Sequence, residues 1–207
     1  MSIRTLVFDL GNVIAFFDHR RASKRLAEHS GMTAEEVHAV LFDKRLEDDY
    51  ESGRLATEEL LRYARKRCGF TCPDEVLIEA YGDIFWPNPN VIDLLPRLKP
   101  NYRLLLLSNT CDLHARKFLP QFADALRHFD ALVLSHQVGL RKPRPEMFAH
   151  ALQLARCRAE ECLLIDDLPA NVAGAKACGW QGIVYRGAEE LRRELAEHGV
   201  QWSAEER

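Results

Sequence analysis

The sequence predicts an α/β fold, with a Rossmann-like parallel sheet flanked by helices and a small helical bundle inserted after the first strand. Two features of the chain lead to this prediction. Four short apolar runs alternate with helical stretches, and a strand covered on both faces of a parallel sheet reads as such a continuous run. Roughly residues 17–87 contain no convincing strand, which indicates the insertion.

The first expected strand covers residues 6–8, an apolar run that ends on Asp9. Gly11 and Asn12, a turn signal, follow within two residues. Asp9 is therefore expected at the carboxyl end of a strand, where open α/β sheets bind their ligands. An aspartate that only caps the strand is the simpler interpretation, and this stretch alone leaves both open.

Three further apolar runs end in groups that bind phosphate or metal. Because parallel strands present their carboxyl ends at one edge of a sheet, four such endings favour a shared site over coincidence. The runs and their endings are residues 102–107 with Ser108-Asn109, residues 130–134 with the loop carrying Arg141-Lys142-Pro143, and residues 161–165 with Asp166-Asp167.

Four short amphipathic helices are expected in the insertion. Residues 20–29 can form the first, and Gly31 can end it. A capping box begins at Thr33, Thr57 is the expected N-cap of the third helix, and Pro73 begins the fourth. Each carries apolar side chains on one face, so together they can bury a small core of their own.

The rest of the chain alternates between helix and strand, which favours a parallel sheet with right-handed crossovers. One helix is expected at residues 91–98 and a fifth strand at residues 182–185. The clearest later helices cover residues 145–155, 170–178 and 189–198. We therefore divide the chain into a core of residues 1–16 and 88–207 and an inserted helical unit of residues 17–87.

The composition gives no sign of a nucleic-acid or membrane partner. Of 207 residues, 47% are hydrophobic and 29% charged, and the net charge is −3. No apolar run approaches the roughly 18 residues of a membrane span. Asp9 interrupts the first hydrophobic stretch, so we expect no signal peptide and a cytoplasmic protein. The six cysteines lack paired spacing and are expected as free thiols. The oligomeric state is left open.

Taken in order, the four strand endings resemble the motifs of the haloacid dehalogenase superfamily: a nucleophilic Asp, a Ser or Thr, a Lys and an acidic pair. The Asp-Leu-Gly-Asn-Val run from Asp9 to Val13 is most similar to the branch of bacterial sugar-phosphate phosphatases and the N-terminal phosphatase domain of epoxide hydrolase. The resemblance implies that residues 17–87 form the family's helical cap, which closes over the site and selects substrates.

The resemblance implies a phosphomonoesterase that acts on a small phosphorylated metabolite, for which a sugar phosphate is a candidate. Asp9 can attack phosphorus and form an aspartyl-phosphate. Because a carboxylate and a phosphate dianion repel each other, we expect Mg²⁺ between them. Asp9, Asp166 and Asp167 are the expected side-chain ligands, and the resemblance implies the main-chain carbonyl of Gly11 as another. A pair of helix-capping residues is the alternative for Asp166 and Asp167.

Lys142 and Ser108 complete the expected catalytic set. Lys142 can bridge Asp9 and the phosphate as a point charge, although a solvated basic loop would also fit. Ser108 and Asn109, with the main-chain amides of the following helix start, can hold phosphoryl oxygens; a buried helix cap is the alternative. Asn12 is assigned to substrate binding through its place in the first motif.

The chain departs from the family's phosphatases at Gly11, where these enzymes usually carry a second Asp that protonates the leaving group. Asp18, His19 or an acid of residues 47–51 could replace it. Two other functions remain open. The first is a metal-independent 2-haloacid dehalogenase, which the acidic pair opposes because it wants a cation. The second is a catalytically impaired sugar-phosphate-binding or regulatory protein, which Gly11 favours.

Overall fold

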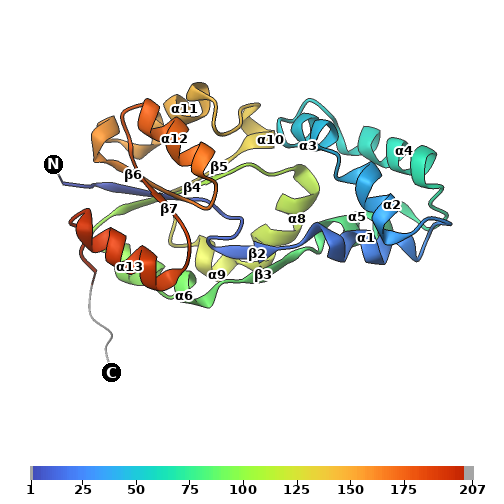
Figure 1. The fold of residues 1–207 in the computed structure, drawn as a ribbon, viewed down its shortest axis with the longest axis horizontal. Coiled ribbons are helices and arrows are strands. Elements are labelled where there is room, and N and C mark those ends of the chain that lie inside the picture. Colours follow the sequence, from blue (N-terminus) through green and yellow to red (C-terminus); the bar gives the residue numbers. More distant parts are fainter. Residues whose placement is uncertain (1, 203–207) are drawn as a thin grey trace.

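A computed structural model describes residues 2–202 and contains the predicted five-stranded parallel sheet (Figure 1). The strand order is β5-β4-β1-β6-β7, so the first strand of the chain lies at the centre of the sheet. The prediction of an α/β fold is confirmed. The strands are β1 (Thr5–Phe8), β4 (Arg103–Ser108), β5 (Ala131–Leu134), β6 (Cys162–Asp166) and β7 (Gln181–Val184).

Burial explains why β1 is central. All four of its residues are buried, and Val7 pairs in parallel with Leu105 on one side and Leu164 on the other. From β1 the chain crosses to β4, whereas from β6 it crosses to β7 in the opposite direction. The adjacent strands β1 and β6 therefore form a topological switch point, and a ligand crevice is expected beyond their carboxyl ends.

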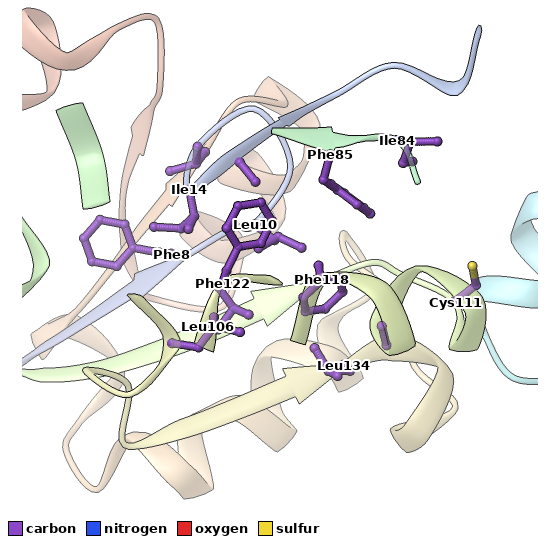
Figure 2. Packing of buried hydrophobic residues seen from close by; sticks show 14 of the residues in the cluster. Phe8, Leu10, Ile14, Ile84, Phe85, Leu106, Cys111, Phe118, Phe122 and Leu134 are labelled. Carbon is purple, nitrogen blue, oxygen red and sulfur yellow. The ribbon is translucent and has the colours of Figure 1, made fainter. Parts of the chain in front are cut away.

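Two apolar layers cover the faces of this sheet. Leu6 and Phe8 face one cluster and Val7 the other, as the two-residue period of a strand requires. Figure 2 shows side chains of the first layer, among them Phe8 and Leu106 from the sheet and Phe118 from a covering helix. The helices after the insertion are α6 (Pro89–Ile92), α7 (Leu95–Leu98), α8 (Asp112–Gln121), α9 (Ala123–Leu126), α10 (Ser135–Val138), α11 (Pro145–Ala155), α12 (Pro169–Ala177) and α13 (Ala188–Glu197), with a 3₁₀ turn at Ala159–Glu161.

Two short helices replace the single one expected at residues 91–98. Pro96 has no amide hydrogen, so it cannot bond to the carbonyl one turn earlier and a continuous helix is broken there. All six cysteines are free, as expected. Within the described residues, no helix combines the length and the apolar character needed to cross a membrane.

The insertion contains five helices rather than the expected four, and they gather at one end of the molecule (Figure 1). The additional helix is α3, whose sequence is almost entirely charged and buries only Tyr50. The capping box at Thr33 is confirmed. The helices are α1 (His19–Ala27), α2 (Ala34–Leu41), α3 (Lys44–Glu51), α4 (Thr57–Cys68) and α5 (Asp74–Gly82).

The expected N-cap at Thr57 is wrong. Ala56 occupies that position, and Thr57 begins α4. The Thr57 hydroxyl instead donates to Asp112 at 2.7 Å and hydrogen-bonds the hydroxyl of Tyr50 at 2.9 Å. A partly buried hydroxyl requires a partner, and here the partners join α3, α4 and the start of α8.

A two-stranded ribbon that the sequence reasoning missed connects the insertion to the sheet. The strands β2 (Ala15–Phe17) and β3 (Phe85–Pro87) pair in antiparallel fashion, so the chain leaves for the insertion and returns from it side by side. Just beyond β3, the buried amide of Asn88 donates to the carbonyl of Val13 and to the hydroxyl of Tyr185, each at 2.8 Å. These bonds fix the base of the ribbon.

We predict that Leu106→Ala lowers the free energy of unfolding by about 2–5 kcal/mol, because Leu106 is fully buried in the central sheet and its truncation leaves a cavity. Leu168→Ala is the matched control, since that side chain is 53% exposed and its loss should change stability by no more than about 0.5 kcal/mol. Urea unfolding measures both. Equal midpoints for the two variants would contradict the packing described.

Candidate active site

The strand ends bring Asp9, Lys142 and Asp166 into one buried cluster. The ammonium of Lys142 lies 2.9 Å from Asp9 Oδ1 and 2.6 Å from Asp166 Oδ2, and all three residues are buried. The side chain of Lys142 is therefore buried, which is contrary to the alternative of a solvated basic loop. The lysine forms an ion pair with two carboxylates at the switch point of the sheet.

The charges of this cluster depend on one another. Burial, together with the nearby Asp166, raises the pKa of Asp9 to about 7 although Lys142 opposes the shift. Burial disfavours the charge on Lys142, yet the attraction of Asp9 and Asp166 leaves the pKa of this lysine above its usual value. The lysine is thus a fixed cation in a water-poor environment, where charges interact strongly.

The two adjacent acids lie in different environments. Both oxygens of Asp166 are occupied, since it accepts hydrogen bonds from Asn171 and the Leu168 amide as well as the ion pair with Lys142. Asp167 is only half-buried and accepts a single side-chain hydrogen bond, 2.9 Å long, from Asn12. Asp167 therefore keeps free oxygen lone pairs beside Asp9.

These carboxylates form a donor set that suits a hard divalent cation. One oxygen from each of Asp9, Asp166 and Asp167 lies within 4.8 Å of the others. Three acids face one lysine, so the cluster carries excess negative charge, and oxygen-only ligands are what Mg²⁺ prefers. The residues present therefore fit the expected ion.

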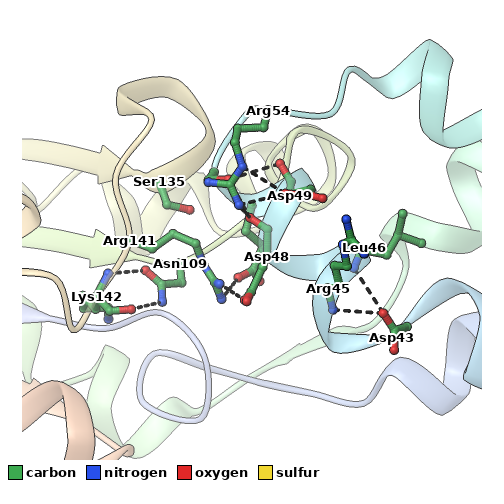
Figure 3. A network of polar contacts seen from close by, with 12 residues as sticks. Asp43, Arg45, Leu46, Asp48, Asp49, Arg54, Asn109, Ser135, Arg141 and Lys142 are labelled. Carbon is green, nitrogen blue, oxygen red and sulfur yellow. Dashed lines mark hydrogen bonds and ion pairs between the residues drawn. The ribbon is translucent and has the colours of Figure 1, made fainter.

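The side chains of Asn12 and Asn109, both predicted to bind substrate, form hydrogen bonds with other residues of the protein. Asn12 adopts a left-handed backbone conformation with φ of 54° and donates to Asp167. The side chain of Asn109 accepts from the amide of Lys142 and donates to its carbonyl, both at 2.9 Å (Figure 3). Each amide fixes a charged residue, so contact with a phosphate would fall on main-chain groups instead. Ser108 is buried, and its hydroxyl makes one long hydrogen bond of 3.4 Å.

One side of the acidic helix α3 faces this site. Arg141, beside Lys142, forms ion pairs with Asp48 and Glu51 (Figure 3). Glu47 lies 3.3 Å from His19 Nδ1, and burial together with Glu51 raises the pKa of Glu47 to about 7. These contacts are consistent with the hypothesis that an acid of residues 47–51 faces the cleft.

Two cavities adjoin the cluster. The larger measures about 390 Å³, and among its lining residues, which come from α3, the turn after it, the loop around Lys142 and the start of α12, the basic ones outnumber the single acid. Its charged residues are Lys44, Asp48, Arg54, Arg141, Lys142 and Arg144. The smaller, of about 60 Å³, lies beside Gly11, Ser108 and Asn109. An anionic ligand would be attracted through the first cavity toward the strand ends.

A side chain at Gly11 would require the ring of Phe17 to move. A Cβ atom at Gly11 would lie 2.8 Å from a ring carbon of Phe17, which is closer than van der Waals contact allows. The backbone at Gly11 is not left-handed, so the constraint is one of space and not of conformation. Sequence reasoning missed this role of Phe17, because nothing in the spacing indicates that the β2 ribbon folds back onto the first motif.

Cys111 is not an activated thiol. It is the N-cap residue of α8, but it is buried, and burial raises the pKa of its thiol well above the usual range. The favourable effect of a helix N-terminus is outweighed by the loss of water.

Comparison with known proteins agrees with this geometry. Residues 3–179 match the family of haloacid dehalogenase-like hydrolases. A D-ribitol-5-phosphate phosphatase of Bacteroides thetaiotaomicron is 26% identical over 93% of this chain and 97% of its own length. The rat bifunctional epoxide hydrolase 2 is 27% identical over 67% of this chain, a match that spans only 26% of that longer protein.

Solved structures share the fold. A predicted HAD-like family hydrolase from Porphyromonas gingivalis superposes with a TM-score of 0.81 at 28% identity, over 97% of this chain and all of that one. A HAD family enzyme of Bacteroides thetaiotaomicron, solved in complex with magnesium and inorganic phosphate, has a TM-score of 0.77 at 24% identity over 89% of this chain and 95% of its own.

We predict that Lys142→Met destabilises the metal-free protein by about 3–5 kcal/mol at neutral pH, because it leaves buried carboxylates without their cation. The exposed neighbour gives the matched control, Arg144→Met. Loss of the lysine removes the one contact that lowers the pKa of buried Asp9, so the loss of stability should be small at low pH and grow as pH rises. Urea unfolding at several pH values measures the loss in the free energy of unfolding. Equal losses in the Lys142 and Arg144 variants would contradict the role of the ion pair.

Proposed function

Because the chain belongs to the haloacid dehalogenase-like hydrolases, we propose that it is a Mg²⁺-dependent phosphomonoesterase that acts through an aspartyl-phosphate on Asp9. The observation that carries this proposal is the buried cluster of Asp9, Lys142 and Asp166, with Asp167 beside it. Its substrate would be a small phosphorylated metabolite. A relative that acts on D-ribitol 5-phosphate supports a sugar or sugar-alcohol phosphate.

In the proposed reaction a carboxylate oxygen of Asp9 attacks phosphorus and the bond to the departing alcohol oxygen breaks. Water then attacks the aspartyl-phosphate, which releases inorganic phosphate and regenerates the carboxylate. Lys142 holds Asp9 in place and offsets charge on the phosphoryl oxygens. The main-chain amides that follow Ser108, at the start of α8, are suited to hold the remaining oxygens.

Asp9, Asp167 and the main-chain carbonyl of Gly11 would hold the metal ion. When bound, Mg²⁺ offsets the repulsion between the nucleophile and the phosphate. Asp166, with both oxygens occupied, would position Lys142 and leave direct coordination to Asp167. A HAD family enzyme with a related fold was solved with magnesium and inorganic phosphate, which supports Mg²⁺ as the ion.

Charge disfavours the dehalogenase alternative. A metal-free reaction at carbon would leave Asp166 and Asp167 facing Asp9. Among the described residues of this cluster, Lys142 would then be the one cation to balance the three acids.

The insertion would serve as the cap. Arg141 already ties α3 to the loop of Lys142, which gives the cap a direct connection to the catalytic residues.

We predict that the protein releases phosphate from a panel of small phosphorylated metabolites with Mg²⁺ and loses this activity in EDTA. Asp9→Asn should abolish turnover, since an amide cannot attack phosphorus. Asp167→Asn should weaken Mg²⁺ binding, measured by calorimetry, far more than it changes thermal stability.

Asp124→Asn, at a side chain that is 97% exposed, is the matched control for both variants. Full activity in EDTA would contradict the metal assignment and favour the dehalogenase. No release from any substrate with Mg²⁺ would favour the binding-protein alternative.

We predict that the glycine at position 11 limits the rate. General acid–base assistance contributes about 10²–10⁴-fold, so turnover should rise steeply as the leaving alcohol becomes more acidic. Gly11→Asp alone should gain little, because its Cβ meets the ring of Phe17, whereas Gly11→Asp with Phe17→Ala should gain more. Phe17→Ala alone is the control. A flat dependence on leaving-group acidity, without gain in the double variant, would point to a proton donor in the cap.

A further inference from the structure

Two cysteines meet at the amino end of β6, at the edge of the sheet opposite the candidate active site. The Sγ atoms of Cys157 and Cys162 lie 3.5 Å apart, and both cysteines are free. Cys162 is the first residue of β6, whereas Asp166 is the last. The pair therefore lies a strand's length from the catalytic cluster, and the proposed reaction uses neither thiol.

The two cysteines differ in how firmly the backbone holds them. Cys162 is fixed within the sheet, where it pairs with Thr5 of β1. Cys157 lies in the connection after α11, which ends at Ala155, and one 3₁₀ turn over Ala159–Glu161 then leads into β6. Because Cys157 belongs to neither a helix nor a strand, its side chain can turn toward Cys162 without breaking a hydrogen bond of the sheet.

A polar contact keeps the sulfur of Cys157 beside Cys162. The thiol of Cys157 donates to the hydroxyl of Thr5 at 3.3 Å, and that hydroxyl donates in turn to the carbonyl of Ala155 at 3.0 Å. A disulfide needs its sulfur atoms about 2.05 Å apart. The separation of 3.5 Å must therefore shorten by about 1.5 Å, a movement that rotation of one side chain supplies.

Exposure sets the order in which the two thiols can react. Cys157 is partly exposed, whereas Cys162 is fully buried. Burial, together with the neighbouring Cys157 and Glu161, raises the pKa of the Cys162 thiol above its usual value. The thiolate is the reactive form of a cysteine. Cys157 is therefore the thiol that meets a reagent from solvent, and Cys162 reacts with a sulfur that is already beside it.

We propose that Cys157 and Cys162 form a reversible oxidation site, a dithiol that closes to a disulfide when the protein meets a small-molecule disulfide such as oxidised glutathione. The Cys157 thiol loses its proton to solvent and attacks one sulfur of the reagent, which forms a mixed disulfide and releases one glutathione. Cys162 then loses its proton and attacks the sulfur of Cys157, which releases the second glutathione. The protein loses two electrons and the reagent gains them.

The test treats the folded full-length protein with oxidised glutathione, blocks the remaining thiols by alkylation and determines peptide masses without reduction. Trypsin cuts after Arg158, between the two cysteines, so the disulfide joins two separate peptides and lowers their joint mass by the two hydrogens lost. We expect this joined pair in the wild-type protein and its disappearance after treatment with dithiothreitol. Cys72, a partly exposed cysteine between α4 and α5, is the internal control and should carry glutathione or the alkyl group.

Two variants separate the steps. Cys162→Ser should increase the mixed disulfide on Cys157 by about 10-fold or more over the wild-type protein, because no second thiol remains to displace glutathione. Cys157→Ser should leave Cys162 unmodified, since that side chain is shielded from solvent. If Cys162→Ser fails to fold, Cys157→Ser and the peptide masses of the wild-type protein decide the outcome.

Three results would overturn the oxidation site. The first is a mixed disulfide that persists on Cys157 of the wild-type protein, and the second is an unmodified pair in protein whose Cys72 has reacted with glutathione. The third is a disulfide that forms only in urea, because the folded arrangement would then not bring the two sulfur atoms together. None of these measurements uses phosphate release, so they are independent of the proposed phosphatase function.

Discussion

The buried ammonium of Lys142 is the interaction on which the arrangement of this site depends. The parallel sheet delivers Asp9 and Asp166 to neighbouring strand ends, because β1 and β6 are adjacent at its centre. Two carboxylates brought that close in a water-poor environment would repel each other, so both could not stay ionised without a cation between them. The lysine contacts both, at 2.9 and 2.6 Å, and so allows the fold to hold acids where the topology places them.

Amide side chains then fix each charged group without changing the balance of charge. Asn109 holds the backbone of Lys142, Asn171 holds Asp166, and Asn12 holds Asp167. Since amides are neutral, the cluster keeps three acids against one lysine. That excess is what a divalent cation requires, and the same hydrogen bonds restrict the motion of its ligands before it binds. The neutral amides thus position the charged side chains, and the acids and the lysine set the charge of the site.

The sequence predicts most of the sheet, because buried parallel strands are continuous apolar runs, and it predicts the four strand endings that converge. It does not predict α3, whose charged sequence buries only Tyr50 and whose acids Asp48 and Glu51 form ion pairs with the distant Arg141. The β2–β3 ribbon is also missed, since three-residue strands separated by the whole insertion leave no periodicity. The contacts of Asn12 and Asn109 escape prediction because spacing cannot tell whether an amide faces a ligand or a neighbouring side chain.

The missing acid at Gly11 follows from the same ribbon. Phe17 of β2 lies where a side chain at Gly11 would be placed, so an acid at this position of the first motif would require the Phe17 ring to move. Titratable groups in the wall of the adjoining cavity are His19, Glu51 and His114. Burial lowers the pKa of His19 to about 4, which leaves its imidazole neutral, and raises the pKa of Glu51 although Arg141 opposes that shift. Because Glu51 belongs to α3, proton delivery in the proposed reaction would depend on the position of the insertion rather than on the first motif.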